Sequence, residues 1–448
     1  MTPPPSPMTG AEKIIARACG LAAVAPGDIV FPVPDMVMIH DNMVPGVKRA
    51  LDELGIDRLA APEKVVMVTD HEVLYGSARA AQYGSLNRGA ARAWKVGRFF
   101  DVGRGGHGHV FPMERGMVLP GMFYFDNDRH CTNAGAIGAV GFRMGMEIAR
   151  VLATGTNWIM VPKTLKLTLR GRLAPGVFAR DLGAHVGARI ARGALPFNLD
   201  YRVLEYAGDL DQFDLAARVG LCSAPTEMGA YGVFFPPSEA ILAHARRVAQ
   251  QPFEPVFSDP DAAYEAQAEI DIAALEPQVS LPGGVQNAVP VSEVAGTAVD
   301  HAFIGSCASG MYEDIAIAAS YLAGRRIADG VRLFVVPGSE DTTRRLVADG
   351  LMQVLLDAGA VLLPAGCGPC NDAVVGPIDS GEVSISTATN NPAGRFGARD
   401  ARLFLGSPAT VAASAVAGRI VDPRSAPRTD RRAGAAPAAP PTSKETVQ

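Results

Sequence analysis

Two cysteines stand three positions apart in a glycine-rich stretch of the chain, PAGCGPC. They are Cys367 and Cys370, and a third cysteine, Cys307, lies sixty positions before the first of them. Three thiolates are one fewer than the four ligands that close a tetrahedral zinc site or a common iron–sulfur site. The set therefore predicts a metal centre with one open position, at which a substrate oxygen can bind.

The spacing alone leaves other chemistry open. A Cys-x-x-Cys pair also serves as a redox dithiol, or contributes to a structural zinc site whose fourth ligand is a histidine. Six cysteines in 448 residues are too few for a disulfide framework. The remaining three, Cys19, Cys131 and Cys222, are interpreted as ordinary buried thiols.

Acidic and imidazole side chains occur together in several loops. They are Asp70 with His71 in VTDHE, His107 and His109 in GHGHV, Asp128 and His130 in DNDRHC, and Glu227 in APTEMG. A carboxylate beside an imidazole fixes the tautomer of the ring and raises its basicity. These groupings predict general acid–base chemistry next to the metal centre.

Strand–loop–helix units must position these side chains. Apolar runs that end in loops containing Gly or Asp recur along the chain, most clearly at 65–71, 302–310, 333–339, 360–368 and 383–390. Strands that alternate with helices predict an α/β fold with buried, mainly parallel sheets. Ligand-binding loops of such sheets follow the carboxyl ends of the strands, so separate loops can bring the three cysteines to one point.

The segment after Cys307 has the signals of a helix. Ser309 is expected to cap this helix, which is expected to end at Leu322. Cys307 would then lie in a strand-to-helix loop, and the other two cysteines in the loop after the strand near residue 361.

Composition limits the classes of function. The net charge of −5 and the scattered Arg and Lys residues argue against a nucleic-acid partner. The opening MTPPPSPMTG has no features of a signal peptide, and no stretch approaches the roughly 18 apolar residues of a membrane span. We expect a cytoplasmic enzyme without a membrane or nucleic-acid partner.

Seven motifs follow one another along the chain: AEKIIARACG…VAPGDIV…HDN, VTDHE, HVFPMERGMVLPG, DNDRHCTNAGAIGA, IGSCASGMYEDIAIAA, PAGCGPC and GSPATVAASAVAGRIVD. In this order they resemble the motifs of the aconitase superfamily, and most closely those of the large subunit of the two-subunit 3-isopropylmalate dehydratases. The likeness runs from about Met8 to Asp422. It implies a hydro-lyase of hydroxy di- or tricarboxylic acids.

The resemblance implies three α/β/α domains around a 4Fe-4S cluster, which we place at 8–160, 161–285 and 286–423. The Pro- and Asp-rich segment 251–290 is expected to be the linker ahead of the last domain. The segment 424–448 is rich in Pro, Ala and Arg with almost no large apolar residue, and is expected to be a disordered tail.

The resemblance also assigns roles by position. Cys307, Cys367 and Cys370 match the cluster ligands, and Asn133 matches an asparagine that hydrogen-bonds near the cluster. Arg395 matches a carboxylate-binding arginine, a role that suits the guanidinium fork. The residues that match the acid–base network are Asp70, His71, His109, Asp128, His130 and Glu227.

Two positions depart from the family pattern. Arg129 stands where the family usually has a serine, and Asn390 stands where it commonly has an arginine. We interpret this as an arginine lost from one wall of the site and another gained on the facing wall. The hypothesis is that Arg129 takes over a contact with a substrate carboxylate.

The swivelling domain of single-chain aconitases, with its Gly-rich Ser-Ser-Arg stretch, has no counterpart here. A separate small subunit is therefore expected to supply the serine that removes the carbon-bound proton. In this interpretation His109 or His130 protonates the leaving hydroxyl group of a small hydroxy acid.

The expected function is that of a cluster-bearing large subunit acting on a small hydroxy dicarboxylate such as isopropylmalate or a methylated malate. Within the same class, hydration of maleate- or citraconate-like acids is the alternative. Two alternatives belong to other classes: a regulator that binds RNA after losing its cluster, and a zinc-stabilised module without catalysis. Iron and sulfide analysis separates the last of these from the cluster enzyme.

Overall fold

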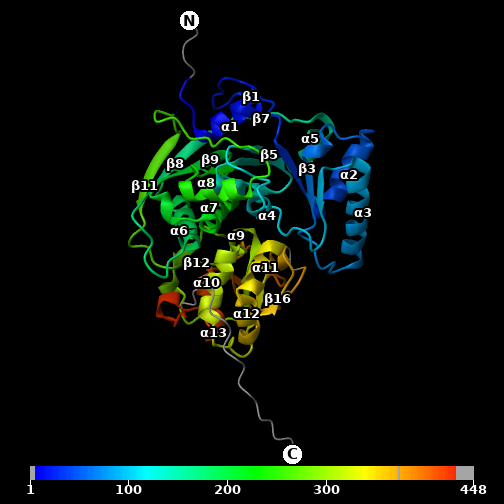
Figure 1. Ribbon diagram of the computed structural model, residues 1–448. Helices are drawn as coiled ribbons and strands as arrows, with labels where there is room; N and C mark the ends of the chain where they lie inside the picture. Colours follow the sequence, from blue (N-terminus) through cyan, green and yellow to red (C-terminus); the bar gives the residue numbers. More distant parts are fainter. Residues whose placement is uncertain (1–5, 372–373, 430–448) are drawn as a thin grey trace, which may run out of the picture.

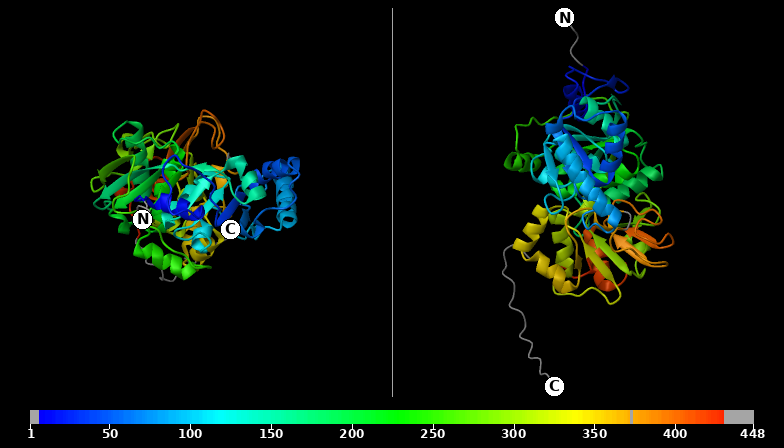
Figure 2. Two further views of the ribbon diagram at one scale, coloured as in Figure 1. Left: turned by 90° about the horizontal axis from the view of Figure 1, so that it is seen from above. Right: turned by 90° about the vertical axis from the view of Figure 1, so that its right-hand side faces the viewer.

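The computed structural model describes residues 6–371 and 374–429 and forms two lobes (Figure 1). The upper lobe holds two large β-sheets side by side, and the lower lobe holds a third large sheet, as the side view in Figure 2 also shows. A small two-stranded sheet of β1 (Ile29–Val30) and β7 (Ile159–Met160) lies at the top of the upper lobe. Helices pack around each sheet, and the sheet faces form the hydrophobic cores.

The first sheet is parallel throughout, with the strand order β4-β3-β2-β5-β6. Every residue of its three central strands is buried, as expected for strands covered on both faces. Its strands are β2 (Met36–His40), β3 (Val65–Val68), β4 (Arg98–Phe100), β5 (Phe123–Asp126) and β6 (Val140–Arg143). Its helices are α1 (Gly10–Ala18), α2 (Val44–Glu53), α3 (Ala78–Trp94), α4 (Phe111–Glu114) and α5 (Ile148–Thr154).

The second sheet is also parallel, with the order β10-β9-β8-β11. Its strands are β8 (Lys163–Arg170), β9 (Arg202–Gly208), β10 (Gly232–Phe234) and β11 (Ala266–Asp271), and its helices are α6 (Ala179–Ala191), α7 (Leu215–Glu227) and α8 (Glu239–Val248). The C-terminal half of α7 packs against the 3₁₀ helix η3 (Arg129–Ile137), which follows β5. This contact joins the first two sheets.

The third sheet has seven strands in the order β13-β12-β18-β17-β14-β15-β16. Five of them are parallel, and β12 is antiparallel to both of its neighbours. The strands are β12 (Gln278–Ser280), β13 (Ala288–Pro290), β14 (His301–Ile304), β15 (Arg332–Val335), β16 (Val361–Leu362), β17 (Val383–Ser386) and β18 (Arg402–Leu405). The helices are α9 (Ser306–Ser309), α10 (Tyr312–Leu322), α11 (Glu340–Ala348), α12 (Leu351–Ala358) and α13 (Pro408–Ala417). The predicted α/β class with mainly parallel sheets is confirmed.

Ser309 does not cap the long helix after Cys307. Ser309 is instead the last residue of the short helix α9, which contains Cys307. The helical conformation is interrupted at Gly310, and α10 begins two residues later. The carboxylate of Asp314 accepts a hydrogen bond of 3.2 Å from the backbone N–H of Met311, so an acidic side chain stabilises this helix start. The predicted end of the helix at Leu322 is confirmed.

The expected linker 251–290 is not a linker over its whole length. Residues 266–271 form the edge strand β11 of the second sheet, and 278–280 and 288–290 form β12 and β13 of the third sheet. The sequence is rich in turn residues, but backbone pairing with existing sheets still orders it. The third sheet therefore begins ahead of residue 286, where the last domain was expected to start.

The expected tail is ordered at its beginning. The side chain of Arg424 lies 2.7 Å from Asp422 and 3.7 Å from Glu276, and the backbone N–H of Thr429 donates to Ser320. Residues 430–448 lie outside the described part of the chain. Within the described ranges, no helix is both long and apolar enough to cross a lipid bilayer.

Candidate active site

Asp70 lies at the centre of a buried network at the carboxyl edge of the first sheet. It lies two residues after the end of β3, and its side chain is fully buried. Its Oδ2 lies 2.8 Å from Nδ1 of His40 and accepts a hydrogen bond of 2.8 Å from the backbone N–H of Gly108. Its Oδ1 lies 2.8 Å from Nδ1 of His71. One carboxylate thus fixes two imidazole rings and a backbone turn.

His40 lies between two buried carboxylates. Its ring contacts Asp70 on one side, and its Nε2 lies 3.2 Å from Asp126, the last residue of β5. Burial alone would lower the pKa of His40, but the negative charges of Asp70 and Asp126 outweigh burial and raise it. A protonated His40 therefore separates two carboxylates that would otherwise repel each other.

The second part of the network joins η3 to the end of α7. The ring of His130 lies 2.8 Å from Glu227 through Nε2 and 3.4 Å from Asp128 through Nδ1. Asp128 also accepts a hydrogen bond of 3.0 Å from the backbone N–H of His130, so it fixes both the start of η3 and the ring. The side chain of Asn390 hydrogen-bonds Glu227 as well.

The imidazoles of the network differ in charge state. Burial opposes protonation of His71 and His130, but neighbouring carboxylates outweigh it and raise the pKa of His71 to about 10 and that of His130 to about 9. Burial lowers the pKa of His107 and of His109, and the protonated His40 adds to this effect. The site therefore holds proton donors and neutral rings side by side, as acid–base catalysis requires.

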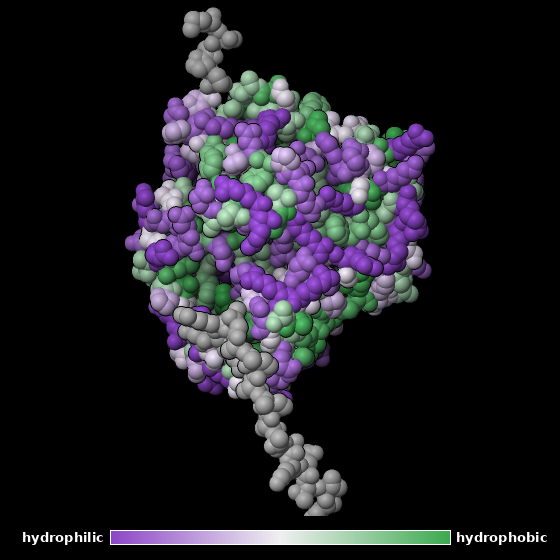
Figure 3. Space-filling view, in the orientation of Figure 1, coloured by the Kyte–Doolittle hydropathy of each residue, from purple (hydrophilic) through white to green (hydrophobic). Residues whose placement is uncertain are grey.

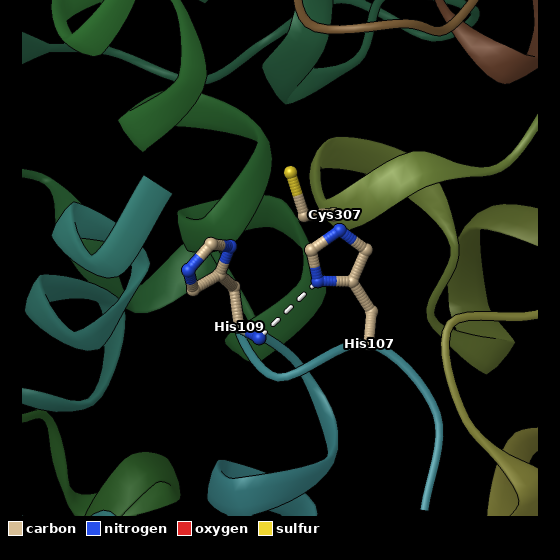
Figure 4. A group of neighbouring side chains, drawn as sticks. All are labelled: His107, His109 and Cys307. Carbon is tan, nitrogen blue, oxygen red and sulfur yellow. Dashed lines mark hydrogen bonds between the residues drawn. The ribbon is translucent and has the colours of Figure 1, made fainter. Parts of the chain in front are cut away.

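The loop that carries His107 and His109 reaches the cysteine-bearing part of the third sheet (Figure 4). Ring nitrogens of both histidines and Sγ of Cys307 all lie within 4.8 Å of one another. The backbone N–H of His109 donates to Nδ1 of His107 at 3.3 Å. The amide of Asn133 donates to the backbone carbonyl of Cys307 at 2.9 Å. These contacts place α9 against the histidine network.

Cys367 and Cys370 lie in the loop after β16, near enough to Cys307 for the charges of the thiols to affect one another. The backbone N–H of Cys367 donates to the carbonyl of Asp70 at 2.8 Å, and the two thiol groups are hydrogen-bonded to each other. Arg395 lies 3.8 Å from Sγ of Cys370 through Nη2. The hydrogen bond from Cys367, with help from Arg395, holds the pKa of Cys370 well below its usual value, although burial opposes this.

The three cysteines have the properties of ligands for an iron–sulfur cluster. Their exposed fractions are 3–6%, and none of them is in a disulfide. Two buried polar atoms beside Cys307, Oδ1 of Asn133 and Oγ of Ser309, have no hydrogen-bond partner. A thiolate donor set and unpaired polar atoms next to it fit a bound inorganic group. The set of His107, His109 and Cys307 would also fit a single metal ion, so geometry alone does not choose between the two.

Each residue named from the sequence for the acid–base network lies in this site. The carboxyl ends of β3 and β5 bring Asp70, His71 and Asp128 together, and the end of α7 adds Glu227. Arg129 is half exposed, but its Nη1 lies 3.5 Å from Glu227, so it borders the site. Cys131 and Cys222 are buried as expected, whereas Cys19 is partly exposed, which corrects that interpretation.

Sequence reasoning missed four residues of the site. His40 and Asp126 end buried apolar strands, which is the position from which Asp70 was recognised, so this signal was present. Asp41 accepts backbone hydrogen bonds from His71 and from the residue after it. Arg180 lies inside α6, hydrogen-bonds the carbonyl of Ala388, and had no local signal.

Comparisons with known proteins match nearly the whole chain. The profile of the aconitase family (aconitate hydratase) matches residues 12–418. The chain is 40% identical to 3-isopropylmalate dehydratase large subunit 1 of Methanopyrus kandleri, over 93% of this chain and 99% of that protein. It is 38% identical to a probable 3-isopropylmalate dehydratase large subunit and 36% identical to a probable methanogen homoaconitase large subunit, both of Methanothermobacter thermautotrophicus. These two matches cover 93% of this chain and 99% and 98% of those proteins.

Proposed function

The chain belongs to the aconitase family, and from this premise we propose that it is the large subunit of an iron–sulfur hydro-lyase. Its substrate would be a small hydroxy dicarboxylate such as isopropylmalate or a methylated malate. The single observation that carries the proposal is the meeting of two sets of side chains. Cys307, on the third sheet, lies within 4.8 Å of the histidine pair that the first sheet contributes.

Cys307, Cys367 and Cys370 would hold a 4Fe-4S cluster. When bound, the cluster supplies a Lewis acid that polarises the hydroxyl group of the substrate. Asn133 would fix α9 through its hydrogen bond to the carbonyl of Cys307, and so keep this thiolate in place.

His130 is the best placed proton donor. It lies between Asp128 and Glu227, which stabilise its protonated form, and its side chain is 11% exposed and so accessible from the site. In the dehydration direction His130 would give its proton to the departing hydroxyl group. Glu227 and Asp128 would keep the ring oriented throughout.

Arg129 and Arg395 would bind substrate carboxylates. Arg129 borders Glu227, and Arg395 borders Cys370, so the two guanidinium groups flank the site from different sheets. A guanidinium group suits a carboxylate because it can donate two parallel hydrogen bonds.

The names of the relatives describe large subunits, which supports a small-subunit partner for this chain. We propose that this partner supplies the base that removes the carbon-bound proton. The division places the acid on this chain and the base on the partner, on opposite sides of the substrate.

Anaerobic purification with the small subunit tests the proposal. Iron and sulfide are expected at about four each per chain, and isopropylmalate and methylated malates are the first substrates to assay. Cys367→Ser should lower the iron content and abolish turnover, whereas Cys19→Ser, a control outside the site, should leave both unchanged. One zinc and no sulfide per chain would contradict the proposal.

A further inference from the structure

Arg180 is a buried cation for which the proposed reaction has no role. It is the second residue of α6, and its exposed fraction is 8%. Hydrophilic side chains cover much of the molecular face drawn in Figure 3, where water solvates their charges, but water reaches little of Arg180. A buried charge is normally paired with an opposite charge. The guanidinium group of Arg180 therefore needs a negative partner.

The hydrogen bonds of Arg180 do not supply this negative charge. Its Nη1 donates to Oγ of Ser223 at 3.0 Å, and its Nη2 donates to the backbone carbonyl of Ala388. Both acceptors are neutral. Among residues 6–371 and 374–429, no carboxylate oxygen lies within 4.0 Å of the guanidinium nitrogens of Arg180. The two hydrogen bonds orient the cation but leave its charge without a partner.

Two carboxylates in the surroundings of Arg180 have other partners. Glu227 lies 2.8 Å from the ring of His130 and 3.5 Å from Arg129. Asp314 accepts a backbone hydrogen bond of 3.2 Å at the start of α10. Neither carboxylate forms an ion pair with Arg180 in the described part of the chain.

Arg180 binds a segment that contacts both cysteine loops. This segment, 387–390, follows β17. Oγ1 of Thr387 accepts a hydrogen bond of 2.9 Å from the backbone N–H of the residue directly before α9. Oγ1 of Thr389 lies 3.9 Å from Sγ of Cys370. The carbonyl that accepts from Arg180 lies between these two residues, so the guanidinium group holds the segment where it reaches the cysteines.

The helix α7 provides a second connection between Arg180 and the cysteines. Ser223, which accepts from Arg180, lies in α7. At Gly220 of the same helix, an added Cβ would lie 3.7 Å from the carbonyl oxygen of Ala308 and 4.0 Å from the backbone nitrogen of Arg180. Ala308 directly follows Cys307 in α9. The start of α6 and the helix that carries Cys307 thus meet at one point of α7.

The cysteines are the negative groups that remain for Arg180. Burial lowers the pKa of Arg180, and the charges of Cys307 and Cys370 oppose this effect more than those of Asp314 and Glu227 do. Thiols become negative when they bind a metal centre. The net charge around an iron–sulfur cluster is one of the factors that set its reduction potential.

We propose that Arg180 supplies the buried positive charge that balances the thiolate-bound cluster, and that this charge raises the reduction potential of the cluster. The inference rests on the proposed function, because the cation gains its anionic partner only when the cluster is bound. Arg180 is a positioning residue in this proposal, since it acts through the cluster and the segment 387–390 and does not touch the substrate.

Redox titration of the anaerobically purified complex, followed by the electron paramagnetic resonance signal of the reduced cluster, tests the proposal. Arg180→Gln removes the charge and keeps an N–H donor. Reduction should become about tenfold less favourable, the order expected for one buried charge on a neighbouring element, which lowers the midpoint potential by about 59 mV for one electron. Arg180→Lys keeps the charge and should stay near the wild-type potential. A normal potential in Arg180→Gln with a lowered one in Arg180→Lys would overturn the proposal, because the hydrogen bonds would then matter and the charge would not.

Arg218 offers a matched control. It is also fully buried, and it donates to two backbone carbonyls at 3.1 and 3.0 Å. Burial lowers the pKa of Arg218 to about 10, and the charge that most opposes this effect is that of Asp211, not that of a cluster cysteine. Arg218→Gln should therefore leave the potential unchanged. An equal fall in Arg218→Gln and Arg180→Gln would overturn the proposal, because the effect would not depend on where the charge lies.

A second pair of variants leaves Arg180 itself intact and decides the matter if Arg180→Gln holds too little iron for titration. Ser223→Asp places a carboxylate beside the guanidinium group and neutralises its charge, whereas Ser223→Asn keeps a neutral acceptor there. The potential should fall in Ser223→Asp and stay at the wild-type value in Ser223→Asn. A wild-type potential in Ser223→Asp, with iron and sulfide also at wild-type levels, would overturn the proposal and leave the proposed function intact. A wild-type chain without iron and sulfide would overturn both.

Discussion

Buried charge at the level of single residues explains how the site holds protons. His40 contacts Asp70 at 2.8 Å and Asp126 at 3.2 Å, with all three side chains fully buried. Removing one partner of a buried ion pair typically costs about 3–5 kcal/mol, because the remaining charge stays unpaired and without water. The network is therefore expected to be rigid, with each proton held on a particular ring nitrogen.

The stability of the protein should depend on the proton of His130. The folded chain keeps this proton up to a pH of about 9, because the pKa of His130 is raised to that value, whereas an unfolded histidine loses it near 6.5. The stabilisation is thus complete below about pH 6.5 and is lost as the pH rises toward 9, by at most about 3 kcal/mol.

Melting temperatures measured between these pH values test the dependence. His130→Gln should flatten the alkaline fall in melting temperature relative to the wild type, because glutamine does not titrate. Equal slopes in the two proteins would show that the proton of His130 does not contribute.

Arg129 should decide which acid the enzyme prefers. Its Nη1 lies 3.5 Å from Glu227. The side chain of Asn390, which stands where the family commonly has an arginine, also contacts Glu227. Arg129 therefore lies next to the position of the arginine that this chain lacks. Loss of a charged hydrogen bond of about 1.5–3 kcal/mol predicts that Arg129→Ser raises KM for the preferred acid roughly 10- to 100-fold. A panel of hydroxy diacids measures this change, with Arg79→Ser, an exposed change outside the site, as the control. An unaltered order of preference would contradict the role of Arg129.

At the level of elements, the sequence predicted the strands and the loops that carry the chemistry. Apolar runs followed by Asp-His or by Gly-Cys located β3 and the loop of Cys367 correctly. Cys307 was expected in a loop between strand and helix, but it lies in the short helix α9. The start of α10 was predicted wrongly, because Ser309 belongs to a separate short helix that a local capping signal does not reveal. The strands β11 to β13 were missed. β11 and β12 pair with β8 and β18, which lie far away in the sequence, and the three-residue strand β13 pairs only with β12.

The turn before Cys307 requires glycine. Gly305 has φ 147° and ψ −142°, a conformation that essentially only glycine adopts, and an added Cβ would lie 2.5 Å from the carbonyl oxygen of Val336. Gly305→Ala should therefore cost at least about 2 kcal/mol and displace α9 with Cys307. Reduced iron content and a lower melting temperature are the expected results.

Gly324 offers a matched control for this change. It also has a positive φ, of 72°, but an added Cβ at this residue would meet no atom within 4 Å among the described residues. Gly324→Ala should cost about 1–2 kcal/mol and leave the iron content unchanged. Equal loss of iron in the two variants would show that the shape of the turn before Cys307 is not what holds the cysteine.

At the level of the whole molecule, the site exists only where three sheets meet. The loops of the first sheet, the end of α7 from the second and the cysteine loops of the third each supply part of it. Sequence motifs identified these parts one by one, but the distances between them depend on how the sheets pack. Arg180 illustrates this limit, because its role in joining α6 to the carbonyl of Ala388 follows from packing alone.

The lobes are joined next to the histidine loop. The backbone N–H of His107 donates to the carbonyl of Gly338 at 2.8 Å. Arg115 forms a two-point ion pair with Asp341 at 2.5 and 3.0 Å, across 226 residues of sequence. Because both side chains are partly exposed, this pair should contribute about 1 kcal/mol or less to the contact between the lobes.

Weakening this ion pair should loosen the contact between the two lobes, which keeps the cysteines buried. Arg115→Ala is expected to speed the loss of the cluster in air by up to about fivefold. The free energy needed to open the contact between the lobes locally should fall by the roughly 1 kcal/mol that the ion pair contributes. Bleaching of the iron–sulfur absorption measures the rate. Arg344→Ala is the control, since Arg344 binds the same Asp341 at 3.0 Å but within the lower lobe. Equal bleaching rates in Arg115→Ala and the wild type would mean that the lobes are held together by the backbone contacts at Gly338 rather than by this pair.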